Sequence, residues 1–75
     1  MGTYAFKTSR GIFYIVYRHG RWHAVFNDES LGSYITPAQA ADDLAGGHTS
    51  WPNGIDPARL NISSDLGDWM FIRAV

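Results

Sequence analysis

Alternation of apolar and polar positions is clearest between residues 12 and 26. Residues 12–18 and 21–26 are rich in β-branched and aromatic side chains, and His19-Gly20 lies between them. Such segments favour β-strands, and a two-residue connection with Gly in second place favours a tight hairpin turn. The pattern therefore predicts a β-hairpin with its turn at His19-Gly20.

A two-residue turn also sets the register of this hairpin, because it pairs Arg18 with Arg21 and brings Phe13 opposite Phe26. Side chains then alternate between two faces. One face is wholly aromatic and aliphatic, and we expect it to form core: Phe13, Ile15, Tyr17, Trp22, Ala24 and Phe26. The other face is mixed and basic: Tyr14, Val16, Arg18, Arg21, His23 and Val25.

A helix is predicted to begin after Thr36. This residue is a favoured N-cap, Pro37 suits the first helical position, and Gln39 completes a capping box. Gly46-Gly47 is expected to end the helix. Its inward stripe is Ala40, Ala41, Leu44 and Ala45, and Ile35 and Ala40 occupy the positions of a hydrophobic staple.

The remaining segments predict three further strands and one long loop. Residues 4–7 and 31–35 are short strand candidates, the second after a polar turn at residues 27–30. Residues 48–67 are predicted to form a loop with single helical turns at 56–60 and 63–66. A loop of this length either has a function or covers the core with its own apolar side chains. A final strand is predicted at 68–75, with its two faces as follows: Trp69, Phe71 and Arg73 on one, Met70, Ile72 and Ala74 on the other.

The order of these elements, β-β-β-β-α-loop-β, predicts a single small α+β domain over residues 1–75. We expect one antiparallel sheet with a short helix packed on one face. The chain has no Cys, so it cannot use disulfides or thiol chemistry, and three Trp, four Tyr and four Phe supply its packing. No signal-peptide pattern or apolar run of about 20 residues is present, so we expect a soluble cytoplasmic protein without a membrane partner.

Several segments resemble those of a group of short uncharacterised bacterial proteins. The resemblance rests on Gly20-Arg-Trp22, Leu31-Gly-Ser-Tyr34, Ala41-Asp-Asp-Leu-Ala-Gly-Gly-His-Thr49, and Asp65-Leu66 followed by Trp69. It covers most of the chain between residues 11 and 71. The resemblance implies a shared fold and brings no activity, cofactor or catalytic residue with it.

The histidines are the main candidates for site chemistry. His19 and His23 are four residues apart, a spacing that suits zinc on a helix, but on a hairpin their side chains need not converge. His48 follows the helix, where imidazole interacts favourably with exposed carbonyl groups. No nucleophile elbow or phosphate-binding loop is present. We therefore expect no metal, no cofactor and no enzymatic activity.

Charge is unevenly distributed although the net charge is only −1. Residues 1–26 hold Lys7, Arg10, Arg18 and Arg21 and no acid, whereas residues 27–68 hold every acid of the chain. We expect a binding or regulatory module that acts through protein contacts or self-association. Its candidate contact residues are Tyr14, Arg18, Arg21, His23 and Trp51, the last as an exposed aromatic anchor. The alternative is a nucleic-acid-associated protein that uses the basic face of the 12–26 hairpin.

Overall fold

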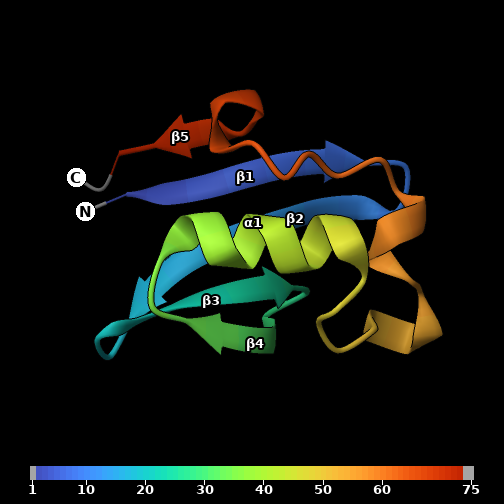
Figure 1. Ribbon diagram of the computed structural model, residues 1–75, viewed down its shortest axis with the longest axis horizontal. Helices are drawn as coiled ribbons and strands as arrows, with labels where there is room; N and C mark the ends of the chain where they lie inside the picture. The colour runs from blue at the N-terminus through green and yellow to red at the C-terminus, as the bar shows by residue number, and fades with distance from the viewer. Residues whose placement is uncertain (1, 74–75) are drawn as a thin grey trace.

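Five antiparallel strands form one sheet in the computed structural model, which describes residues 2–73 (Figure 1). The strand order is β4-β3-β2-β1-β5. The elements are β1 (Thr3–Thr8), β2 (Gly11–Arg18), β3 (Arg21–Phe26), β4 (Glu29–Tyr34), α1 (Pro37–Gly46), the single-turn 3-10 helices η1 (Pro52–Gly54), η2 (Pro57–Arg59) and η3 (Leu66–Asp68), and β5 (Met70–Ile72). The predicted α+β class and single antiparallel sheet are confirmed.

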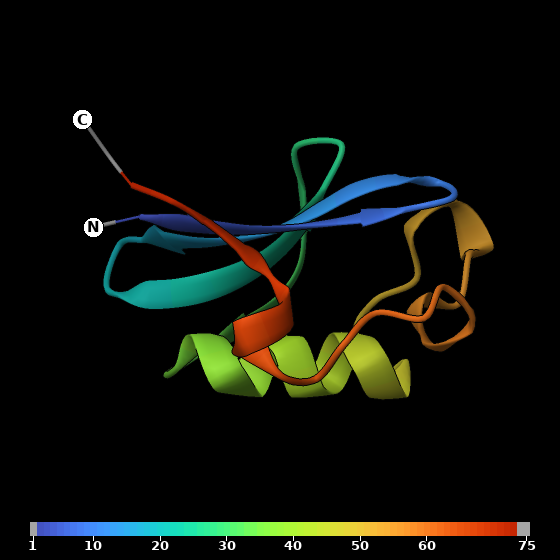
Figure 2. The same cartoon turned by 90° about the horizontal axis from the view of Figure 1, so that it is seen from above.

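The sheet is covered on one face only. Figure 2 shows α1 and η3 on the same side of the sheet, and no helix formed by residues 2–73 lies on the opposite side. After the long loop, the chain returns as β5 beside β1, where Ile72 pairs with Thr3 (Figure 1). The uncovered side of the sheet is called the open face below.

The hairpin of β2 and β3 has the predicted register. Its pairs run from Arg18 with Arg21 to Tyr14 with Val25. His19 (φ 52°) and Gly20 (φ 81°) are both left-handed, which is the conformation that a type I′ turn requires.

The aromatic face of this hairpin forms the core, with one exception. Phe13, Ile15, Ala24 and Phe26 are buried, and the rings of Phe13 and Phe26 stack 4.5 Å apart. Tyr17 is 42% exposed, so its assignment to the core was wrong. A ten-residue helix spans only about 15 Å, whereas the eight-residue β2 is about 26 Å long. The hairpin tip therefore extends beyond α1, and Tyr17 packs edge-on against Trp22.

The connection between β3 and β4 is tighter than predicted. Asn27 and Asp28 alone make the turn, both with positive φ, so β4 begins at Glu29 and ends one residue before Ile35. A bulge then shifts the register, because Val25 pairs with Ser30 while Ala24 pairs with Gly32. The extra residue is Leu31, which is 3% exposed and belongs to the core. The bulge thus adds one large apolar side chain to the covered face.

Helix α1 has the predicted start and end. The hydroxyl of Thr36 accepts from the Gln39 N–H at 3.2 Å, and the Gln39 side chain reaches back to the Thr36 N–H. Gly47 (φ 74°) provides the left-handed C-cap. Ile35 remains 72% exposed, so the predicted staple position buries little of it.

The buried side of α1 is built mainly from alanine. Ala40, Ala41 and Leu44 have no exposed surface, and Ala45 is half-buried. Methyl side chains let the helix axis lie close to the stacked rings of the sheet. Ten residues are too few for an isolated helix, so this contact is what keeps α1 folded.

The segment between α1 and β5 covers one end of the core. Ile62 is buried, and Leu60 and Leu66 pack against the core cluster, as the packing interpretation of residues 48–67 predicts. The side chains of Asp56 and Asp65 accept from the N–H groups of Ala58 and Gly67 at 2.9 and 2.8 Å. These caps hold η2 and η3. The turn predicted at 56–60 occurs as η2, whereas the turn predicted at 63–66 is displaced toward the C-terminus and occurs as η3.

Strand β5 is shorter than the predicted strand at 68–75. Residues 66–68 form η3 instead, and Ala74 and Val75 lie outside the described residues. The alternation of Trp69 and Phe71 is as predicted, since Trp69 packs on Phe6 (5.2 Å) and Phe71 on Tyr4 (4.9 Å). These two aromatic contacts hold β5 against the covered side of β1.

The bulge at Leu31 generates a test of the core. We expect Leu31→Ala to lower the free energy of unfolding by about 2–5 kcal/mol, because it leaves a cavity beneath α1. The matched control Ile35→Ala removes an aliphatic side chain that is 72% exposed and should change stability by less than about 0.5 kcal/mol. Urea unfolding followed by circular dichroism measures both, and equal losses would contradict the position of Leu31 in the core.

Candidate interaction surface

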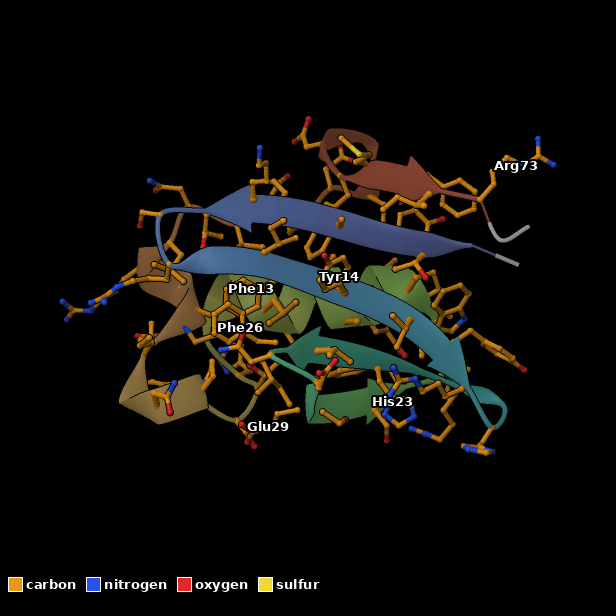
Figure 3. All side chains as sticks on the ribbon, turned by 180° about the vertical axis from the view of Figure 1, so that it is seen from behind. Phe13, Tyr14, His23, Phe26, Glu29 and Arg73 are labelled. Carbon is orange, nitrogen blue, oxygen red and sulfur yellow. The ribbon has the colours of Figure 1, made fainter. Side chains whose placement is uncertain are left out.

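An apolar groove runs along the open face between β2, β1 and β5. Its volume is about 430 Å³. Most of its wall is apolar: Ala5, Ile12, Tyr14, Met70 and Ile72. Lys7 and Asp68 also line it, one cation and one anion. Figure 3 views the sheet from this side and shows Tyr14 near the middle of β2.

The groove follows from the register of three neighbouring strands. Ala5 of β1 lies between Tyr14 of β2 and Met70 of β5. A methyl group between two large side chains leaves a hollow above the central strand. The groove is therefore produced by one small residue at one register position.

Three aliphatic side chains around the groove are exposed to solvent. Met70 is 65% exposed, Ile72 46% and Ile12 36%. An apolar cluster on an uncovered sheet face is the kind of feature that marks interaction sites on small soluble domains. Sequence reasoning placed Met70 and Ile72 on one face of the last strand but did not identify this groove. That would have required knowing that β5 pairs with β1.

A short basic strip lies on the same face toward the hairpin tip. It consists of Arg18, Arg21 and His23, and Arg18 is paired directly opposite Arg21. Like charges at opposite positions of a sheet repel each other. The Arg21 guanidinium turns toward β4, where Nε donates to Ser33 Oγ (3.1 Å) and Nη2 donates to the Ser33 carbonyl (3.2 Å). His23 Nδ1 lies 3.0 Å from Ser30 Oγ, so its ring is also tied to β4.

The other N-terminal cations do not join this strip. Lys7 lies near the opposite end of the sheet, where it pairs with Ile12 and lines the groove. Arg10 is in the turn between β1 and β2 and lines a different cleft. The structure therefore brings together only part of the N-terminal positive charge.

Trp51 is separate from the other four predicted contact residues. It is 50% exposed and lines a cleft of about 720 Å³ with Arg10, Arg59 and the loop around η1. Its indole Nε1 donates to the Gly47 carbonyl at 2.9 Å, which fixes the ring beside the end of α1. Tyr14, Arg18, Arg21 and His23 thus share the open face, and Trp51 belongs to the loop that covers the core.

The described residues include the side chains considered above for metal binding and catalysis. Among residues 2–73, no group of three His, Asp or Glu side chains is arranged to hold a metal ion. The His48 ring lies against Gly46, where a Cβ would approach it to 2.7 Å, and the Thr49 hydroxyl donates to the Ser50 carbonyl at 3.0 Å.

Over the same residues, no helix combines the length and apolar character needed to cross a membrane.

A polar cleft at the start of α1 contains one perturbed group. It is lined by Arg21, Tyr34, Gln39, Asp42 and Asp43, among others. Burial raises the pKa of Tyr34 to about 12, and hydrogen bonding to Asp43 and the negative charge of that carboxylate act in the same direction. Tyr34 therefore remains a neutral hydrogen-bond donor to Asp43 throughout the physiological pH range.

The raised pKa of Tyr34 predicts a separate step in an alkaline titration. Tyr34 should stay protonated until about pH 12, while an unperturbed tyrosine ionises near pH 10. Because the folded pKa is above the unfolded one, the stabilisation is complete below about pH 10 and is lost as pH rises toward 12. NMR titration of the tyrosine rings, with Tyr34→Phe for assignment and Asp43→Asn to lower the pKa, measures this. Ionisation of Tyr34 near pH 10 would contradict the contact.

Comparison with protein-family models, with curated proteins and with solved structures finds no match for this chain. A role for the open face must therefore be argued from its own geometry. The surface offers an apolar groove, a basic strip at one end, and exposed aliphatic side chains at the strand edge. Together they form one continuous candidate interaction surface.

Proposed function

We propose that this protein is a non-enzymatic, cytoplasmic binding module that contacts a protein partner through its open face. The observation that supports this is the apolar groove bordered by exposed Ile12, Met70 and Ile72 on a sheet that α1 covers on one side only. A protein surface with protruding apolar side chains matches this shape. No cofactor enters the proposal.

Burial of these side chains supplies part of the free energy for binding. Completely burying an exposed aliphatic side chain contributes about 1.5–3 kcal/mol relative to leaving it in water. Three partly exposed side chains and the Tyr14 ring therefore offset part of the cost of association. The groove alone is too small for a tight complex, so the basic strip belongs to the same contact in this proposal.

The basic strip indicates the chemistry of the partner. Arg18 and Arg21 occupy paired positions at the hairpin tip, so a carboxylate of the partner placed near them would find two cations close together. A partner with an apolar ridge and an adjacent acidic side chain fits both parts of the surface. Tyr14, Arg18, Arg21 and His23 are the contact residues in this arrangement, and Trp51 lies outside it.

Substitutions on the open face test the proposal. Affinity capture from native cell extract, quantified by mass spectrometry, should yield a partner whose recovery falls at least tenfold for Ile12→Glu and for Arg18→Glu. Trp51→Ala and Arg59→Glu alter the separate cleft and should leave recovery unchanged. Equal recovery with all four variants, each confirmed as folded by circular dichroism, would exclude the open face as the contact.

Nucleic-acid binding is the alternative use of the basic strip, and it has a distinct signature. With two arginines in the strip, the slope of log K against log salt for duplex DNA would be no steeper than about −2. On the protein-contact proposal, fluorescence anisotropy with labelled DNA and RNA should show no binding near physiological salt. Salt-sensitive binding that Arg18→Glu abolishes and Arg59→Glu spares would establish the alternative instead.

A further inference from the structure

The two edges of the sheet differ in how they are protected against pairing with another strand. At the β4 edge, the Arg21 guanidinium donates to the Ser33 carbonyl, and the Ser50 N–H donates to the Leu31 carbonyl at 3.0 Å. This strand also carries a bulge, and Glu29 lies at its start. Bulges, charges and occupied backbone groups are the features that prevent edge-to-edge association.

Within the described residues, strand β5 itself holds no bulge and no charged residue. Among residues 2–73, β5 pairs with β1 only, and its three residues are apolar and exposed. Met70 is 65% exposed, Phe71 49% and Ile72 46%. An exposed apolar edge strand readily accepts another strand. Phe71 is held in place by the Tyr4 ring and lies over Gly2, where a Cβ would meet its ring at 2.4 Å, so the edge is already ordered.

The charges around β5 indicate which strand fits. Asp68 precedes the strand and Arg73 follows it. In an antiparallel pair of two identical strands, the Asp68 end of one copy lies beside the Arg73 end of the other, at both ends of the contact. A parallel pair would bring like charges together instead. The segment is thus self-complementary in the antiparallel sense, as a two-fold symmetric interface requires.

We propose that two copies of this chain associate through β5, with their β5 strands antiparallel about a two-fold axis. The two sheets then form one continuous sheet, and the open faces of both copies lie on the same side. The apolar grooves become neighbours across the axis, separated by Met70 and Ile72 of the two copies. This inference concerns the edge of the sheet and does not depend on the partner proposed for the open face.

The size of the contact sets the expected strength. Two three-residue strands with their side chains bury less than the roughly 1,200 Å² typical of stable complexes. We therefore expect a reversible dimer that is populated at high protein concentration and dissociates on dilution. Backbone pairing and the apolar edge side chains provide the attraction, so added salt should not abolish it.

Sedimentation equilibrium over a wide concentration range tests the proposal. The wild-type chain should show a monomer–dimer equilibrium. The Thr3–Ile72 and Ala5–Met70 pairs direct the backbone groups of residues 70 and 72 toward β1, so Phe71→Pro removes the backbone donor that faces the edge. Met70→Lys places a cation in the apolar contact, and each change should raise the dissociation constant at least tenfold. Ile35→Lys introduces the same charge at an apolar side chain that is 72% exposed elsewhere, and it should leave the equilibrium unchanged.

A second measurement identifies the strand and remains valid if a variant is poorly folded. In wild-type protein, the Phe71 amide, which faces the edge, should become more protected from hydrogen exchange as concentration rises, while β4 amides do not. A monomer at every concentration overturns the proposal, as does a dimer in which protection increases elsewhere. Either result leaves the capture experiment with Ile12→Glu and Arg18→Glu unaffected, so failure here is distinguishable from failure of the open-face contact.

Discussion

The rest of the structure depends on burying one face of the β2–β3 hairpin beneath a helix made largely of alanine. Phe13 and Phe26 stack 4.5 Å apart, and Ala40 and Ala41 lie fully buried among the same core residues. The helix needs this contact to remain folded, and the rings need the helix to exclude water. Among residues 2–73, α1 covers one side of the sheet and no second helix covers the other. The open face is the side of the sheet that this single helix leaves uncovered.

Features encoded by neighbouring residues could be predicted from the sequence. The hairpin register follows from the two-residue His19-Gly20 turn, and the start of α1 follows from Thr36, Pro37 and Gln39. In each case the interactions span a few positions along the chain, so their geometry is set locally. The faces of the hairpin follow in turn, because the period of a strand is fixed once its register is known.

Features that depend on distant pairing could not be predicted in the same way. The groove exists because Ala5 lies between Tyr14 and Met70, and nothing near β5 in the sequence specifies β1 as its neighbour. The bulge that buries Leu31 and the exposure of Tyr17 have a similar origin, since each depends on where α1 lies over the sheet. The contact residues suggested by sequence were therefore divided between the open face and the Trp51 cleft.

The position of the exposed apolar side chains bears on both proposals. A small domain buries a limited share of its surface, so aliphatic side chains outside the core reduce its solubility without adding stability. Ile12, Met70 and Ile72 are nevertheless on one face, and Met70 and Ile72 belong to the edge strand that lacks protection. The β4 edge, in contrast, accepts hydrogen bonds from Arg21 and Ser50. If exposed apolar side chains were distributed at random over the surface, they would not gather on the open face and at the unprotected edge of the same sheet. This coincidence favours association on that side, whether the surface added is a second copy or another protein.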